Sequence, residues 1–265
     1  MANARITYNF DAWKEASITV SSEISAANFS PKKNVLDPRP GAFWGTTGDS
    51  SEWIRFDLGS AQTITCFYLN AHNLTANATV VLQANIADSW ASPAEQQQLT
   101  IATDSDGNAL PSLCYFPNWS AYRYWRVTFA DAANPEGRIR VGNIFAGQYY
   151  ELGRNWSDGA RITWMDPSLV TQIPGTVELV KKEDISKRFR QIRVDFSVVT
   201  RAEKKKWETI FRKIGNHAPC ILSLDPTEEP SWESAYCYLL TDMDLAWQMV
   251  DQFDVLTMVF EEKTR

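Results

Sequence analysis

The sequence holds few imidazole groups that could act as a catalytic base, because it contains only two histidines, His72 and His217. A nucleophilic triad requires a base within reach of the nucleophile, and imidazole is the usual one. The sequence also lacks Gly-x-Ser-x-Gly, P-loop, His-Glu-x-x-His and Cys-x-x-Cys motifs. Acidic residues are numerous enough to leave a carboxylate-based glycosidase open. The prediction is nevertheless a protein that is not an enzyme and that needs no cofactor.

Aromatic side chains are the more informative group, with 11 Trp, 13 Phe and 9 Tyr. Sugar binding uses exposed aromatic faces beside polar groups, because the rings stack on the sugar while the polar groups hydrogen-bond its hydroxyls. Trp90 and Trp119 both lie in polar, loop-like surroundings. We expect them to contact either a glycan or a protein partner. His72 and Asn73 follow a predicted strand and are further contact candidates, with a structural turn as the alternative.

The elements that would carry these residues in the first half of the chain are predicted to be strands. Short apolar runs alternate with polar turns, and residues 63–70 are apolar on both faces, which is typical of a strand inside a sandwich. The candidate strands are 52–58, 63–70, 79–86, 122–129 and 139–145. Short strands with long loops favour an antiparallel sandwich or jelly roll.

The second half predicts strands around a single helix. Thr200 and Glu203 form a Thr-x-x-Glu capping box, and Gly215 is placed to end the helix. Apolar residues recur between them with the spacing of one helical face. Strand-like runs lie at 176–180, 189–199, 220–224, 233–240 and 255–262. We therefore expect a domain of residues 1–150 and a second of 151–265, a β-sandwich with one packed helix at about 200–214.

Composition excludes several classes of protein. The chain has 265 residues, of which 44% are hydrophobic and 22% charged, as in ordinary globular proteins. A net charge of −6 argues against sequence-specific nucleic-acid binding. The sequence contains no run of 18 apolar residues, so no insertion into a membrane is predicted. The first residues lack the apolar core of a signal peptide. The four cysteines are expected to be buried thiols, with one bridge per domain left open.

Residues 34–59 carry a family resemblance. They contain Asn34-Val35-Leu36-Asp37, then Trp44, and then Trp53-Ile54-Arg55-Phe56-Asp57-Leu58-Gly59. This order resembles the discoidin-like, galactose-binding-like sandwich, and Tyr124-Trp125-Arg126-Val127 extends the resemblance to about residues 20–147. The resemblance implies a jelly-roll fold, core positions for Trp44 and Trp53, and Asn34 and Asp37 as candidate ligands of a structural Ca²⁺. No cluster of arginines that would clamp a sugar is evident in the predicted loops.

A narrower resemblance concerns the order of three loop motifs. Asp37-Pro38-Arg39-Pro40-Gly41, His72-Asn73-Leu74-Thr75 and Asn134-Pro135-Glu136-Gly137 look like those of prophage and tailed-phage structural proteins. In those proteins a discoidin-like module precedes a domain that opens with Trp-Ser-Asp-Gly, here residues 156–159. The C-terminal strands and helix resemble the tail-tube or distal-tail fold. The resemblance implies a tail-tip or baseplate protein, synthesised in the host cytoplasm and located in the virion tail.

Charge is unevenly distributed in the second half. Residues 181–213 hold 12 Lys and Arg against 5 Asp and Glu, whereas residues 225–265 hold 10 Asp and Glu against 2 Lys and Arg. Either the two segments neutralise each other within one molecule, or the basic helix of one copy meets the acidic edge of the next in a ring. The candidate interface residues are Lys204, Lys205, Arg212, Asp251 and Asp254.

The sequence therefore predicts a structural protein of a phage tail, which forms a ring through its C-terminal domain. Its partners would be other tail proteins and copies of itself, and its outward N-terminal domain would bind a host surface glycan. The alternative is a stand-alone or enzyme-appended carbohydrate-binding module. Fold does not fix function, so both hypotheses require a site.

Overall fold

The structure is a computed structural model, and it describes residues 3–24, 31–39, 41–105, 107–156, 160–173, 177–181, 188–227 and 234–263. Contacts divide the chain into two compact units. The first comprises Met1–Glu151 with Ser223–Ser234, and the second Leu152–Leu222 with Ala235–Arg265. Of the expected Trp-Ser-Asp-Gly segment, residues 157–159 lie outside the described residues. None of the described helices is long and apolar enough to cross a membrane.

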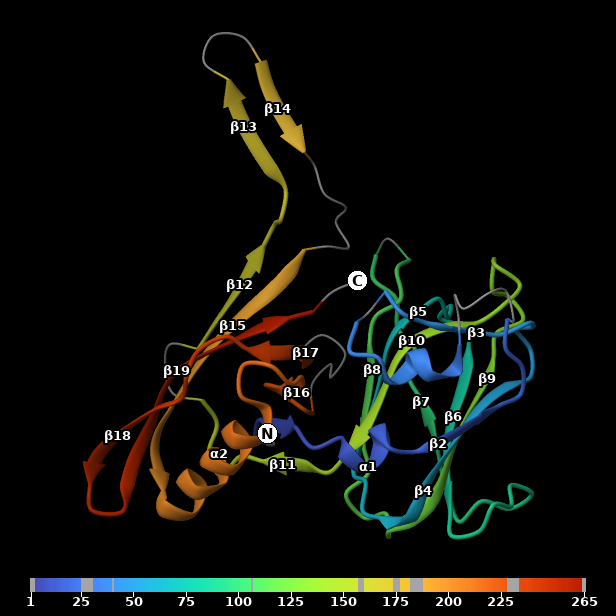
Figure 1. Ribbon diagram of the computed structural model, residues 1–265, viewed down its shortest axis with the longest axis horizontal. Helices are drawn as coiled ribbons and strands as arrows, with labels where there is room; N and C mark the ends of the chain where they lie inside the picture. The colour runs from blue at the N-terminus through green and yellow to red at the C-terminus, as the bar shows by residue number, and fades with distance from the viewer. Residues whose placement is uncertain are drawn as a thin grey trace. The chain divides into compact units, whose positions relative to one another are not determined.

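The first unit is a sandwich of antiparallel sheets, drawn in blue to yellow-green in Figure 1. One sheet has the order β2 (Ser17–Val20), β4 (Glu52–Gln62), β9 (Tyr122–Ala130), β6 (Thr79–Asn85) and β7 (Glu95–Leu99). The other has the order β3 (Trp44–Gly45), β10 (Arg140–Gly147), β5 (Cys66–His72) and β8 (Ser112–Tyr115). Strand β1 (Arg5–Thr7) pairs with β11 (Tyr149–Glu151), and the connections hold α1 (Asp11–Lys14) and η1 (Lys32–Leu36). The predicted mainly-β sandwich is confirmed.

The core of this unit lies between the two sheets and is built by alternate residues of each strand. In β4, Ile54 and Phe56 are fully buried. Trp13 of α1 stacks on Phe56 with 4.2 Å between ring centroids, and its Nε1 donates to the backbone oxygen of Ile144 at 3.0 Å. Trp53 is half-buried on the opposite face of β4, because it alternates with these core residues. Its expected core position is therefore wrong.

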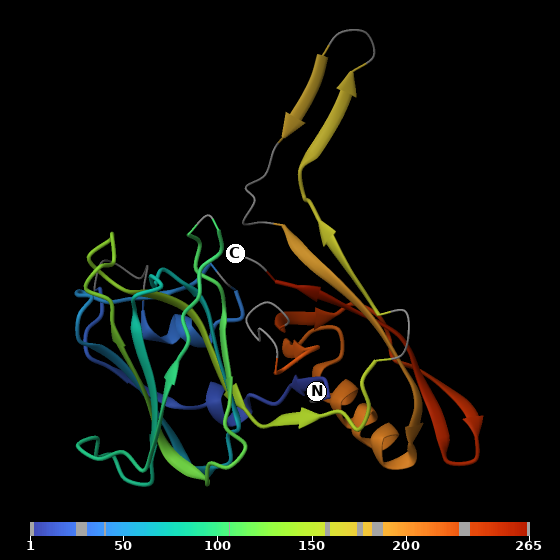
Figure 2. The ribbon, with the colours of Figure 1, turned by 180° about the vertical axis from the view of Figure 1, so that it is seen from behind.

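The second unit combines antiparallel strands with one helix. Its sheet has the order β16 (Cys220–Ser223), β17 (Ser234–Leu239), β19 (Gln252–Glu262), β15 (Phe189–Thr200) and β12 (Arg161–Met165), and β18 (Asp244–Met249) also pairs with β19. Strands β13 (Leu169–Ile173) and β14 (Val177–Lys181) form a separate two-stranded sheet. Helix α2 (Arg201–Ile214) packs on β15 and β19, as Figure 2 shows from behind.

Helix α2 begins and ends where its sequence predicts. The Glu203 backbone N–H donates to Thr200 Oγ1 at 3.3 Å, and the Thr200 backbone N–H donates to Glu203 Oε2 at 2.6 Å. These two bonds are the predicted capping box. Trp207 on the apolar face packs against Phe196 of β15 with 5.0 Å between ring centroids. Gly215 follows with φ +47, so the predicted helix is confirmed at both ends.

Two β-branched residues in the long β15–β19 pair have a left-handed backbone, which is strained for such residues. Val198 has φ 57 and Thr257 has φ 42, and the register shifts twice between residues 194 and 199. The Val198 backbone N–H donates to Asp254 Oδ1 at 2.8 Å, and the Thr257 backbone N–H donates to Asp195 Oδ1. Each irregular position is therefore held by a carboxylate of the facing strand.

We expect Asp254→Ala to destabilise the second unit by about 1–3 kcal/mol, because the half-buried Val198 amide would lose its acceptor. Urea unfolding of the full chain, followed by the circular dichroism of the sheet, measures this change. Asp244→Ala is the matched control, since Asp244 is an exposed carboxylate on β18. Equal stability of the two variants would contradict the role given to Asp254.

Candidate functional site

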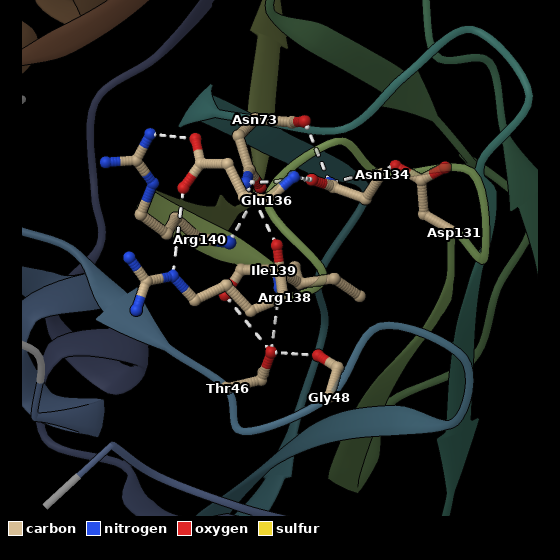
Figure 3. A network of polar contacts seen from close by, with 9 residues as sticks. All are labelled: Thr46, Gly48, Asn73, Asp131, Asn134, Glu136, Arg138, Ile139 and Arg140. Atoms are coloured by element: carbon tan, nitrogen blue, oxygen red, sulfur yellow. Dashed lines mark hydrogen bonds and ion pairs between the residues drawn. The ribbon is translucent and has the colours of Figure 1, made fainter.

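Loops from three parts of the first unit meet at one end of the sandwich, as Figure 3 shows. Asn73, just after β5, ties two of them together. Its Nδ2 donates to the Arg138 backbone oxygen at 3.0 Å, and its Oδ1 accepts from the Arg140 backbone N–H at 2.8 Å. Its own backbone oxygen accepts from Asn134 Nδ2 at 3.1 Å. One amide side chain thus fixes the loop that leads into β10.

Asp131 and Thr46 complete this base of hydrogen-bonded loops. Asp131 is buried and accepts from the Thr75 N–H at 2.9 Å, the Thr75 hydroxyl at 2.6 Å and Asn134 Nδ2 at 3.1 Å. Buried Thr46 accepts the Ile139 N–H at 2.8 Å on its Oγ1. Carboxylates that accept several bonds hold loops firmly, because charge-assisted hydrogen bonds are stronger than neutral ones.

An exposed layer of charged side chains lies on this base. Arg138 Nε lies 3.8 Å from Glu136 Oε2, and Arg140 Nη2 pairs with Glu136 Oε1. In Figure 3 the Glu136 carboxylate lies between the two guanidinium groups. The side chains of Arg138, Glu136 and Arg140 are 49%, 31% and 38% exposed. The Arg140 guanidinium also lies 5.3 Å from the ring centroid of half-buried Phe43. We call these four residues the arginine platform.

The arginine platform can exchange hydrogen bonds with a polar ligand. Each guanidinium offers several N–H donors in a fixed plane, and the carboxylate offers acceptors between them. Exposed ion pairs contribute little to stability, so a ligand can replace part of one at small cost. The sequence alone did not reveal this group. The signal that could have found it was the spacing of Arg138 and Arg140, two residues apart at the start of a strand. This spacing places both on one side of the extended chain.

His72, a predicted contact residue, lies beneath the surface. It is buried, its Nε2 lies 3.0 Å from the Leu110 backbone oxygen, and its Nδ1 accepts from the Leu74 backbone N–H at 3.3 Å. Because Nδ1 is an acceptor, the proton of the neutral ring belongs on Nε2, which donates to Leu110. The imidazole therefore positions the loop after β5 and does not face solvent.

The two predicted tryptophans lie in different surroundings. Trp119 is half-buried and packs on Phe116 and Trp125 of the core, with 4.5 and 5.8 Å between ring centroids. Trp90 is also half-buried, and its Nε1 donates to Asp88 Oδ1 at 2.9 Å. The Arg126 guanidinium of β9 lies 4.6 Å from the centroid of the Trp90 ring. Trp90 is therefore a fixed aromatic group on the outer side of the five-stranded sheet.

The candidate metal ligands have other partners. Asn34 Nδ2 donates to the Phe43 backbone oxygen at 2.9 Å. Asp37 pairs with Arg39 at 2.6 Å, and the hydrogen bonds from Arg39 lower the pKa of this carboxyl below its ordinary value. Within the described residues, no three His, Cys, Asp or Glu side chains gather as metal ligands. The Arg39 guanidinium thus already neutralises the Asp37 carboxylate, whose negative charge a metal cation would need.

The cysteines are free thiols in the structure. Cys66 is fully buried, and this burial raises the pKa of its thiol to about 12. Cys220 and Cys237 are buried together with 3.6 Å between their sulfur atoms, and burial raises the pKa of the Cys237 thiol. Because the thiolate is the nucleophilic form, thiols in these surroundings are poor nucleophiles at neutral pH.

The predicted interface residues of the second unit are partly engaged within the chain. Lys204 pairs with Glu208 at 3.0 Å, and Asp251 pairs with Arg201 at 2.6 Å. Asp254 is buried in the strand pair described above. Because β15 and β19 are neighbours, part of the basic segment neutralises part of the acidic one inside one molecule. The remaining two candidates, on α2, are exposed; they are Lys205 and Arg212.

We expect Asn73→Ala to destabilise the first unit by about 1–3 kcal/mol, because two backbone groups of the loop before β10 would lose their partner. Thermal and urea unfolding of the full chain measure this loss. Asn77→Ala is the control, since Asn77 is exposed in the same connection. If both variants are as stable as the parent chain, Asn73 does not hold the loops together.

Residues 17–140 match the family model described as the F5/8 type C domain. A search of curated protein sequences gave no match. Among solved structures, the lectin domain of lectinolysin complexed with Lewis B antigen is 12% identical with a TM-score of 0.41, and the likeness covers 54% of this chain and 99% of that one. A family 32 carbohydrate-binding module from C. perfringens NanJ, solved in complex with galactose, is 13% identical with a TM-score of 0.40, over 57% of this chain and 100% of that one. On the family match and the two-sheet sandwich, the first unit contains a discoidin-like F5/8 type C domain with the galactose-binding-like jelly-roll fold.

Proposed function

We propose that the first unit binds carbohydrate and that the ligand contacts the arginine platform. The observation that carries this proposal is an exposed acceptor, Glu136, between two exposed donors, Arg138 and Arg140, on a base of hydrogen-bonded loops. The family match over residues 17–140 supports it, because it groups this sandwich with the galactose-binding-like folds. This is the carbohydrate-binding module that the sequence offered as its alternative function.

Sugar hydroxyls suit this surface because each can both donate and accept a hydrogen bond. Two neighbouring hydroxyls can accept from one guanidinium fork while donating to the carboxylate beside it. Phe43, under Arg140, offers part of an apolar ring to the carbon face of a sugar. Since Asn73 and Asn134 fix the backbone beneath, little order has to be created on binding.

Trp90 offers a second place for a sugar, on the outer side of the five-stranded sheet. Its ring is held by Asp88 and by Arg126, so it is a fixed surface on which a sugar ring can stack. The proposal favours the arginine platform, because the platform presents two exposed guanidinium groups and an exposed carboxylate side by side. One substitution in the arginine platform and one at Trp90 distinguish these two candidate sites.

We expect Arg140→Gln to weaken glycan binding at least tenfold, because it removes one guanidinium fork and the partner of Glu136. The measurement is a glycan array with the full chain, followed by calorimetric titration of the glycans that bind. Arg123→Gln is the matched control, since Arg123 is also an exposed arginine of the first unit in an ion pair, with Asp57 at 2.7 Å. Trp90→Ala tests the sheet-face position in the same titration.

Binding that survives Arg140→Gln but is lost in Trp90→Ala would move the site to the sheet face. Binding to no glycan of the array would refute the proposal. Cleavage of a bound glycan would add an activity to the binding, and product analysis by mass spectrometry detects it.

A second candidate function is the structural role in a virion tail that the sequence predicts, and the comparisons lend it no support. The observation that favours it lies in the second unit, which exposes large apolar side chains that are 66% exposed at Trp247, 63% at Met249 and 63% at Trp164. Trp247 and Met249 lie two residues apart on β18, and exposed apolar groups that are neighbours mark contact surfaces between proteins. Assembly with copies of this chain or with other tail proteins would cover them.

We expect the full chain to form a closed oligomer if this second function holds, and Trp247→Ser with Met249→Ser to weaken it. Native mass spectrometry and negative-stain images over a range of concentrations measure the assembly. Ile86→Ser is the control, because Ile86 is 70% exposed in the first unit. A chain that stays monomeric alone and does not enter tail particles when co-produced with tail proteins would refute this role.

A further inference from the structure

A groove runs along one edge of the first unit, between the end of α1, the start of β2 and η1. Its volume is about 750 Å³, and its lining residues are Lys14, Glu15, Ala16, Ser17, Ile18, Lys32, Lys33, Asn34, Leu36 and Asp37. Ligand sites in proteins span roughly 300–1,000 Å³, so this groove has room for a short chain of sugars. The arginine platform contributes none of these residues.

The lining is positively charged in a protein whose net charge is −6. Lys14, Lys32 and Lys33 supply three ammonium groups, and none of them forms an ion pair within the described residues. Of the two carboxylates, Asp37 is already neutralised by Arg39 at 2.6 Å. Glu15 alone therefore opposes three lysines, which makes the groove a place that favours an anion.

The elements that carry the lysines are held in place. The Trp13 ring in α1 is buried and bonded to the opposite sheet, which fixes Lys14 as the last residue of that helix. In η1, Val35 is buried and the side chain of Asn34 is bonded to the Phe43 backbone oxygen at 2.9 Å. The Lys32 backbone N–H donates to Glu23 Oε1 at 3.0 Å. The charges are thus presented by ordered backbone, which lowers the cost of ordering on binding.

The other lining side chains narrow the class of ligand. Ala16, Ile18 and Leu36 are half-buried and form an apolar floor, while Ser17 and Asn34 add polar groups. None of the described lining residues is aromatic, so a neutral sugar has no ring to stack on here. An extended ligand with several negative groups would use the lysines, and its carbon backbone would lie on the floor.

We propose that this groove binds an acidic oligosaccharide, whose carboxylate or sulfate groups pair with Lys14, Lys32 and Lys33. The proposal rests on the carbohydrate-binding function given above and adds a second site of different ligand charge. The arginine platform would hold neutral hydroxyls, and the lysine groove would hold the acidic groups of the same or another glycan.

The experiment is calorimetric titration of the full chain with a galacturonate hexamer, with a sulfated hexasaccharide, and with a neutral hexasaccharide. We expect at least one acidic hexamer to bind, and Lys32→Gln with Lys33→Gln to weaken it at least tenfold. Raising the NaCl concentration from about 0.05 M to 0.3 M should weaken it further, because exposed charges are screened. Lys205→Gln with Arg212→Gln is the matched control, since it removes the same charge from α2 of the second unit.

The proposal fails if neither acidic hexamer binds, or if the two double variants lose affinity equally, which would indicate attraction to charge in general. It also fails if the chain binds phosphatidylserine vesicles and neither hexamer. Titration of the Arg140→Gln variant separates binding in the groove from binding at the arginine platform, because Arg140 does not line the groove. Acidic hexamers that bind equally to Arg140→Gln support the groove even if neutral glycans bind nowhere, and neutral glycans that bind only at the platform leave the first function standing.

Discussion

The hydrogen bonds of one amide side chain, that of Asn73, determine the shape of the loop end of the first unit. Through it, the connection after β5 holds the backbone on both sides of Ile139, and Asn134 donates a hydrogen bond to the backbone oxygen of Asn73. An exposed turn with Gly137 at φ 60 would otherwise be free to take several conformations. The side chains above this turn share one orientation because the backbone below them has been fixed by a residue more than 60 positions away.

The sequence predicted those elements whose pattern is local. The alternation in residues 122–129 indicates a strand, and the apolar spacing between Thr200 and Gly215 indicates a helix, without information from the rest of the chain. Strand β9 and helix α2 lie where they were expected. Strand β18 was missed, because Asp244–Met249 is short and more than half of its residues are exposed, so it shows no buried stripe. The shortest strand of the sandwich, β3, is only two residues long and has no pattern to detect.

The candidate sites were harder to predict, because they depend on residues brought together from distant segments. His72 and Asn73 were recognised as a notable pair, and the structure explains their chemistry by bonds to Leu110 and to the loop before β10. Neither partner is apparent from spacing. The lysine groove likewise joins residues near 14 and near 32, and its charge becomes visible only when Arg39 is seen to neutralise Asp37. Tryptophans in polar segments were a weaker guide, since Trp119 turned inward onto Trp125.

The reciprocal bonds of Asp195 and Asp254 have a consequence for how β15 and β19 find each other during folding. Both strands are long and rich in β-branched and aromatic residues, and such strands can pair in more than one alignment. A slip by one residue would move both carboxylates to the wrong face and leave the amides of Val198 and Thr257 without acceptors. Two separate errors would arise from a single displacement. The irregular positions at Val198 and Thr257 thus favour one register of β15 and β19 and disfavour registers shifted by one residue.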